Sequence, residues 1–237
     1  MIRQTLVVLF IMLSTTLISC CHKEQPAAPA ASPPSSPAAA QPSDYGNYEG
    51  TLVAVGDSLT AGLGVPESEA YPAQLERKLQ EAGYHWRVIN AGISGETTSG
   101  TLSRLNWILK LKPDVVILEI GANDGFRAVS PEIARRNIEG LVSRMQDSGA
   151  VVVLAGMRML RNLGPSYTSA FAKIYPSVAR EKNILLIPFF LDKVAGQANL
   201  NLPDGIHPNA EGYRIVTDTV FPYAVKAIES KRPKKSP

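Results

Sequence analysis

Short apolar runs rich in β-branched residues alternate along this chain with longer segments whose apolar residues recur at helical spacing. The runs lie at Leu52–Gly56, Trp86–Asn90, Val115–Ile120, Val151–Ala155 and Ile184–Pro188. The helical segments are Tyr71–Ala82, Thr98–Leu111, Pro131–Ser148, Ser166–Lys182 and Asn209–Ile228. Near-continuous apolar strands need cover on both faces, and strand–helix alternation is typical of parallel connections. The pattern therefore predicts an α/β fold with a five-stranded parallel sheet between layers of helices.

The first residues of the chain have the layout of an export signal. A basic start at Met1–Arg3 precedes an apolar stretch, Thr5–Ile18, that is short for a membrane span. The stretch ends in Leu-Ile-Ser-Cys, which resembles the lipobox of bacterial lipoproteins, where the cysteine is acylated. We expect a signal peptide at 1–19 and lipidation of Cys20. The alternative is a signal cleaved later, in the alanine-rich stretch near Ala27.

Composition divides the rest of the chain into a tether, a domain and a tail. Residues 20–49 are rich in Pro, Ala, Ser and Gln, which predicts a disordered tether, and residues 231–237 form a basic tail. Residues 50–230 have the apolar content of one folded domain. The only two cysteines are Cys20 and Cys21, so the domain can hold neither a disulfide nor a Cys/His metal cluster. A net charge of +3 gives no reason to expect a nucleic-acid partner, and we expect a monomer.

Polar and glycine-rich clusters follow the predicted strands. They lie at Gly56–Ser58, Asn90–Thr98, Gly121–Gly125 and, before the last helix, Asp204–Pro208. The carboxyl ends of parallel strands open on one edge of a sheet, where α/β proteins usually bind ligands. These clusters should therefore meet.

Ser58 is a candidate nucleophile, because a serine hydroxyl becomes reactive when a base accepts its proton. His22 lies in the expected tether and His85 at a charged helix end, which leaves His207 as the base. Asp204, three residues earlier, can accept from Nδ1 of His207 and turn Nε2 toward the serine. Each residue could instead have a purely structural role: Ser58 as a helix cap, Asp204 as a turn residue and His207 as a capping or packing side chain.

Acyl transfer also needs hydrogen-bond donors for the oxyanion of a tetrahedral intermediate. The candidates are the N–H of Ser58, the N–H of Gly92 and the side-chain amide of Asn123. The alternative is that Gly92 and Asn123 are simply turn residues.

At these residues the chain resembles the SGNH/GDSL hydrolases, in its blocks Gly-Asp-Ser-Leu, Asn-Ala-Gly, Gly-Ala-Asn-Asp and Asp-Gly-Ile-His-Pro, in this order. It is most similar to their bacterial thioesterase I/protease I/lysophospholipase L1 (arylesterase) branch. The resemblance implies a three-layer α/β/α flavodoxin-like sandwich. It also implies a Ser–His–Asp triad that uses no metal or cofactor and hydrolyses esters and thioesters.

Several classes of substrate are compatible with these residues. Met157 and Leu160 form an apolar loop beside the expected site, and Ile93, Phe126 and Ile206 could complete an apolar groove. The alternatives to an acyl-ester or thioester hydrolase are a carbohydrate O-deacetylase on the same triad and a lipoprotein that binds ligands without turnover. We expect an exported protein held at the cell envelope by its lipid anchor, on the periplasmic side of the outer membrane if the cell is Gram-negative.

Overall fold

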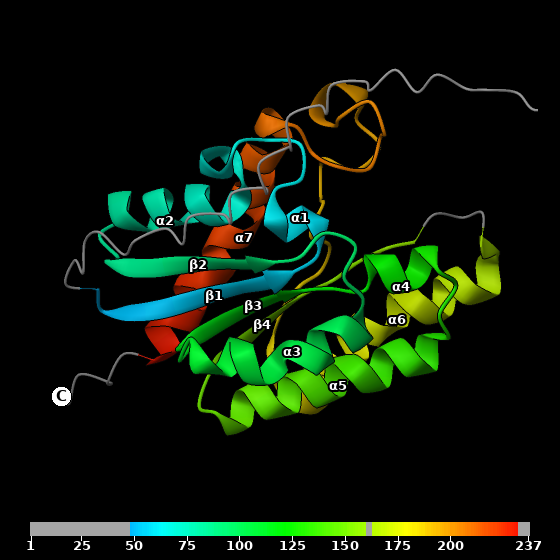
Figure 1. Ribbon diagram of the computed structural model, residues 1–237, viewed down its shortest axis with the longest axis horizontal. Helices are drawn as coiled ribbons and strands as arrows, with labels where there is room; N and C mark the ends of the chain where they lie inside the picture. The colour runs from blue at the N-terminus through cyan, green and yellow to red at the C-terminus, as the bar shows by residue number, and fades with distance from the viewer. Residues whose placement is uncertain (1–47, 160–162, 232–237) are drawn as a thin grey trace, which may run out of the picture. The chain divides into compact units, whose positions relative to one another are not determined.

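The structure is a computed structural model that describes residues 48–159 and 163–231. The expected signal peptide, Cys20, most of the expected tether, Leu160 and residues 232–237 of the tail lie outside these residues. Five strands form one parallel sheet in the order β2-β1-β3-β4-β5, as Figure 1 shows for the first four. They are β1 Gly50–Gly56, β2 Trp86–Gly92, β3 Val115–Glu119, β4 Val151–Ala155 and β5 Leu185–Ile187.

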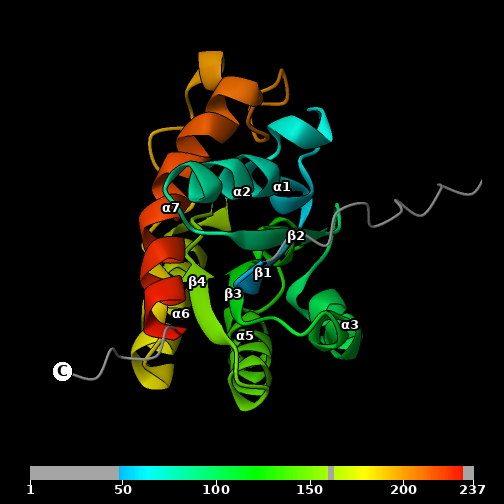
Figure 2. The same cartoon turned by 90° about the vertical axis from the view of Figure 1, so that its left-hand side faces the viewer.

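Helices cover both faces of the sheet (Figure 2). One face carries α2 Tyr71–Glu81 and α7 Ala210–Lys231, and the other carries α3 Thr98–Lys110, α5 Pro131–Asp147 and α6 Pro165–Lys182. The predicted three-layer α/β/α sandwich is confirmed. Among the described helices, none is long and apolar enough to cross a membrane.

The sheet is the centre of the core because its central strands β1, β3 and β4 are mostly apolar, whereas the edge strand β2 exposes Arg87. Leu52, Val53, Ala54 and Val55 of β1 are fully buried, as is every residue of β3. Burying a side chain of this size stabilises the fold by about 1.5–3 kcal/mol. Continuous burial, rather than alternation, is what cover on both faces requires.

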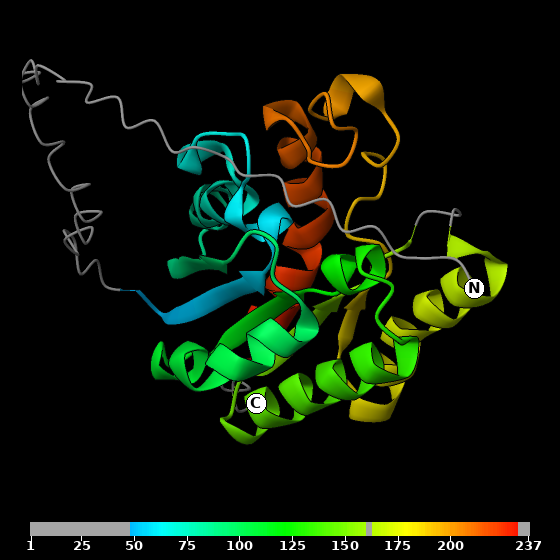
Figure 3. The ribbon, with the colours of Figure 1, turned by 45° about the vertical axis from the view of Figure 1, so that its right-hand side comes forward.

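The strands end in register at the edge that holds the polar clusters. Gly56 of β1 pairs with Gly92 of β2 and with Glu119 of β3, and Glu119 pairs with Ala155 of β4. At this edge β1 runs into α1 Ser58–Ala61, with α4 Ala122–Phe126 nearby (Figure 3). The loop between β5 and α7, which contains a short 3₁₀ helix at Ala198–Leu200, returns to the same edge. The clusters predicted to meet therefore do meet.

Candidate active site

The turn from β1 into α1 presents Ser58. Asp57, not Ser58, caps α1: its Oδ1 accepts the N–H of Leu59 at 3.0 Å. The reading of Ser58 as the helix cap is therefore wrong. A side chain at Gly56 is excluded, since an added Cβ would lie 2.1 Å from Oγ1 of Thr60. This close packing fixes the backbone immediately before the serine.

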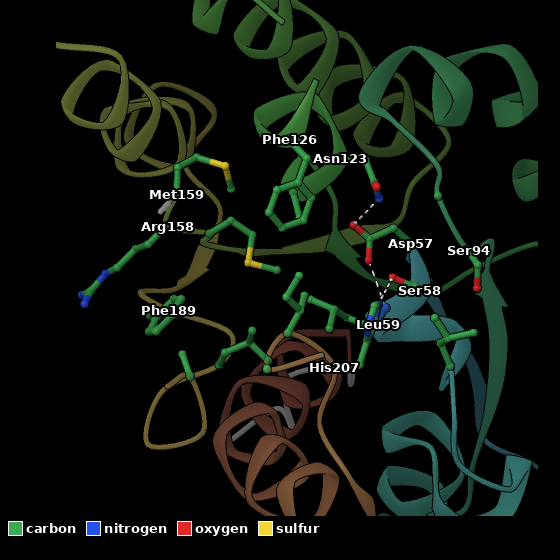
Figure 4. Close-up of a pocket in the computed structure, with 18 of the residues that line it drawn as sticks. Asp57, Ser58, Leu59, Ser94, Asn123, Phe126, Arg158, Met159, Phe189 and His207 are labelled. Carbon is green, nitrogen blue, oxygen red and sulfur yellow. Dashed lines mark hydrogen bonds between the residues drawn. The ribbon is translucent and has the colours of Figure 1, made fainter. Parts of the chain in front are cut away.

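Ser58 and His207 lie 149 residues apart in the chain but are in contact (Figure 4). The hydroxyl Oγ of Ser58 lies 2.9 Å from Nε2 of His207, and Nδ1 of His207 lies 2.7 Å from Oδ2 of Asp204. The carboxylate therefore orients the ring so that Nε2 can accept the serine proton.

Asp204 is held in place by its own loop. Its Oδ1 accepts the N–H groups of His207 at 3.0 Å and Ile206 at 2.9 Å. These backbone hydrogen bonds, with that from the imidazole, lower the pKa of Asp204 to about 2. The carboxyl group is consequently an anion at neutral pH, as an acceptor for Nδ1–H must be.

Asn123 lies in α4, next to the serine. Gly121, at a φ of 116°, begins this short helix in a left-handed conformation that favours glycine. One N–H of the Asn123 amide donates to Oδ2 of Asp57 at 3.2 Å. An amide nitrogen carries two hydrogens, so one donor is left for a ligand in the cavity that Ser58 and Asn123 both line.

The prediction for Gly92 is wrong. Strand β2 continues two residues beyond its expected end, so Gly92 is paired within the sheet, and its N–H donates to Oδ1 of Asn90 at 3.0 Å. An added Cβ would lie 2.3 Å from the backbone nitrogen of Ala61, which shows how closely Gly92 packs against α1 rather than lining the cavity.

Gly95, three residues further on, occupies the position expected of Gly92. It lines the cavity with Ser94, has a φ of 79°, and its N–H has no partner among the described residues. The motif Ile-Ser-Gly-Glu was visible in the sequence, but its glycine could be chosen only by knowing where β2 ends.

The loop that carries Gly95 is fixed at two points. Nε of Arg104 donates to Oε1 of Glu96 at 2.6 Å, and Nη2 of Arg104 donates to the carbonyl of Ala91 at 2.8 Å. Arg127 donates to the carbonyl of Gly95 at 3.0 Å. The N–H of Gly95 therefore has a defined direction before substrate arrives.

Two buried carboxyl groups lie beneath the serine. Burial raises the pKa of Asp57 to about 6. Glu119 is fully buried, as expected from the sequence, and accepts from Oγ1 of Thr60 at 2.8 Å. Burial, and secondly the charge of Asp57, raise the pKa of Glu119 well above its usual range. This shift favours the neutral form of Glu119, and its contact with Thr60 anchors α1.

The cavity next to Ser58 has a volume of about 440 Å³ and mostly apolar walls. Of the predicted lining residues, Met157, Phe126 and Ile206 line it, whereas Ile93 does not line it and is exposed to solvent. Sequence reasoning missed other lining residues, among them Leu63, Arg158, Phe189, Leu191 and Ala195. Within the described ranges, no group of three or more His, Cys, Asp or Glu side chains is placed to hold a metal ion.

Comparison with known proteins assigns this arrangement to a family. Residues 54–215 match the model of the GDSL-like Lipase/Acylhydrolase family, a span that contains Ser58, Asn123 and His207. The chain belongs to this family. Membership makes it a hydrolase that acts on ester bonds.

Individual relatives cover most of the domain. The chain is 39% identical to Esterase TesA of Pseudomonas aeruginosa over 73% of its length and 86% of the relative. It is 36% identical to Thioesterase 1/protease 1/lysophospholipase L1 of Escherichia coli K12, over 71% of the chain and 80% of the relative. The crystal structure of TesA superposes with a TM-score of 0.72 at 38% identity, covering 75% of this chain and 99% of TesA. That of the esterase EstA from Pseudoalteromonas, inhibited by monoethylphosphonate, gives 0.73 at 30% identity, covering 76% of this chain and 100% of EstA.

Proposed function

We propose that this family member is a serine esterase that cleaves carboxylic esters or thioesters through an acyl-enzyme. The observation that carries the proposal is the pair of contacts at His207: 2.9 Å to Oγ of Ser58 and 2.7 Å to Oδ2 of Asp204. An imidazole placed between a hydroxyl and a carboxylate can remove the serine proton and stay oriented while it carries the positive charge.

The proposed reaction has two halves. Oγ of Ser58 attacks the substrate carbonyl carbon and passes its proton to Nε2 of His207. The resulting oxyanion accepts hydrogen bonds from the N–H of Ser58, the N–H of Gly95 and the free N–H of the Asn123 amide. The intermediate then collapses: His207 protonates the departing alcohol or thiol, and the acyl group stays on Ser58. In the second half His207 deprotonates a water that attacks the acyl carbon, and it then returns the proton to Oγ of Ser58 as the C–Oγ bond breaks and the acid leaves.

The cavity supports a substrate with an acyl chain of medium or greater length. Its walls of Met157, Phe126, Phe189 and Leu191 can bury a chain, and methionine adapts to chains of different shape. Relatives named as an esterase, an arylesterase and a thioesterase/lysophospholipase support ester and thioester substrates. A series of p-nitrophenyl esters tests this: activity on acetate alone would favour the carbohydrate O-deacetylase instead.

A fluorophosphonate probe tests the nucleophile, since EstA is inhibited by a phosphonate. We expect covalent labelling of the wild type, none with Ser58→Ala, and labelling slowed strongly with His207→Ala. A wild-type protein that is folded but neither labels nor hydrolyses any ester would overturn the proposal in favour of a ligand-binding lipoprotein. Labelling of His207→Ala at the wild-type rate would remove His207 from the role of base.

We further propose that the protein is an exported lipoprotein acylated on Cys20, as the lipobox-like sequence predicts. Metabolic labelling with a fatty acid should mark the wild type and the matched control Cys21→Ala but not Cys20→Ala. Equal labelling of both variants would contradict the assignment, as would an unlabelled wild type cleaved near Ala27.

A further inference from the structure

Exposed apolar side chains gather where the cavity opens. Seven large apolar side chains of residues 48–159 and 163–231 are exposed, and four of them lie on segments that surround the opening. These are Leu63, Ile93, Phe126 and Ile206. They come from four separate parts of the chain: the turn after α1, the loop after β2, the end of α4 and the loop before α7. Their common position is thus a product of the fold and not of one apolar segment.

A role in the substrate cavity accounts for only part of this group. Leu63, Phe126 and Ile206 line the cavity, but Ile93 does not, and 48% of its surface is exposed. The N–H of Ile93 donates to the carbonyl of Gly56 at 3.0 Å, so the backbone that carries this side chain is fixed to the end of β1. Ile93 directly precedes Ser94 and Gly95, which line the cavity, and an exposed apolar side chain at the edge of an apolar opening is typical of a surface that contacts a partner.

Cations accompany these apolar groups. Arg127 follows Phe126, and Arg158 lines the cavity with its guanidinium 4.6 Å from the ring centre of Phe189. Both side chains are exposed, and neither forms an ion pair with a described carboxylate. Apolar residues that enter the head-group region, together with arginines that pair with phosphate, are the combination by which a protein binds an anionic lipid surface.

We propose that these six residues, here called the rim (Leu63, Ile93, Phe126, Ile206, Arg127 and Arg158), dock the cavity mouth on an anionic lipid bilayer. The ester substrate would then be a lipid of that surface, whose acyl chain leaves the bilayer for the cavity without crossing water. This substrate assignment rests on the proposed function, whereas the docking itself can be tested without catalysis.

The binding experiment uses the exported form, residues 20–237, with Cys20→Ser so that no acyl group at that position contributes, and with Ser58→Ala so that no lipid is consumed. Partition onto vesicles of phosphatidylcholine and phosphatidylglycerol is measured by sedimentation. We expect Ile93→Ser to weaken partition about fivefold to tenfold, because roughly half of an isoleucine is lost from the lipid contact.

Trp107→Ser is the matched control. Trp107 is larger and equally exposed, at 51%, but lies near the end of α3, which runs back toward the opposite edge of the sheet. The Trp107→Ser variant should bind vesicles as tightly as the parent protein. Arg127→Gln with Arg158→Gln should lower partition about 10- to 30-fold on anionic vesicles and little on pure phosphatidylcholine. Equal binding by Ile93→Ser and its parent, or an equal loss in Trp107→Ser, would overturn the docking surface.

A second measurement uses the protein with Ser58 restored. It compares the hydrolysis of an ester held in vesicles with the hydrolysis of a dispersed p-nitrophenyl ester that carries the same acyl group. Ile93→Ser should lower kcat/KM for the first severalfold and leave the second unchanged. A fall in kcat/KM for both esters, or for neither, would contradict delivery of the substrate from the bilayer. If the protein hydrolyses no ester at all, the proposed function fails while the vesicle-binding result still decides the docking.

Discussion

Nδ2 of Asn123 donates a hydrogen bond of 3.2 Å to Oδ2 of Asp57, the residue immediately before Ser58. The proposed oxyanion donor and the turn that carries the proposed nucleophile are thereby joined directly, although α4 and α1 follow different strands. Both groups should respond when either partner is changed.

Asn123→Ala should lower kcat for a p-nitrophenyl ester by about 10²–10³-fold, equivalent to roughly 3–4 kcal/mol of transition-state stabilisation, because one oxyanion donor is lost. The fold should be kept, since Asn123 is not in the core. Circular dichroism and the urea midpoint provide the control. An unchanged kcat would exclude Asn123 from the oxyanion site.

Asp57→Asn should change how stability depends on pH. Burial raises the pKa of Asp57 to about 6, so the folded protein holds a proton that the unfolded chain, with its usual value of 3.8, releases. The stability due to this proton is complete below pH 3.8 and is lost as the pH rises through 6, a change of about 2–3 kcal/mol. Urea titrations from pH 4 to pH 7 should show this decline in the wild type and a smaller one in Asp57→Asn. Parallel curves would show that Asp57 titrates normally.

Gly95→Ala should mainly reduce activity, whereas Gly92→Ala should mainly reduce stability. Alanine at the φ of 79° of Gly95 costs about 1–2 kcal/mol and its methyl group lies beside the oxyanion, so kcat should fall more than stability. Alanine at Gly92 would place Cβ against the backbone of Ala61, so the protein should lose stability or fail to fold. Thermal unfolding and kinetics on the same samples separate the two. A stable, inactive Gly92→Ala would restore the original assignment.

Glu119→Gln should be far milder than Glu119→Ala. A neutral amide can still accept from Oγ1 of Thr60, so the free energy of unfolding at pH 7 should change by less than about 1 kcal/mol. Alanine removes the acceptor and leaves a cavity, with an expected loss of about 2–4 kcal/mol. Thr60→Val, which removes only the donor, is the matched control. If glutamine destabilised as much as alanine, Glu119 would have to be ionised.

Asp204→Asn should lower kcat/KM by on the order of 10³–10⁴-fold at neutral pH, because an amide does not hold the imidazole in the required tautomer. The pKa of Asp204, lowered to about 2, means that the carboxylate's contribution to stability is present above pH 3.8 and is lost as the pH falls through 2. The stability difference between wild type and Asp204→Asn should therefore shrink below pH 4. A difference that grows there would show the opposite shift.

The sequence predicted the architecture well because burial on both faces leaves an unmistakable apolar pattern. Four predicted strands begin at or within two residues of their observed starts, and β5 is only shortened, to Leu185–Ile187. Pro176 and Pro222 lie inside α6 and α7 without ending them, since tertiary packing outweighs the loss of one backbone hydrogen bond. The short helix α4 was missed, because five residues give no periodicity.

Site residues could be predicted from the sequence where the chemistry allows few residue types. They were harder to predict where a residue's role depends on the position of its backbone. Few residues other than His207 could act as a base, but Gly92 and Gly95 differ only in whether β2 has already ended. The cavity walls contributed by Phe189, Leu191 and Ala195 follow β5 and lie outside the four motifs. They lie near Ser58 because β5, which runs parallel to β1, ends at the same edge of the sheet.

The parallel direction of β1 sets a requirement for any attachment through the N-terminus. The chain enters the sheet at Gly50 and reaches the serine only at the far end of the strand, roughly 20 Å away. The proposed attachment at Cys20 would therefore require a tether long enough to span the full depth of the sheet before the cavity opening can turn toward the surface. Stepwise shortening of the tether should reach a length at which the protein is still attached but its cavity opening can no longer face the surface.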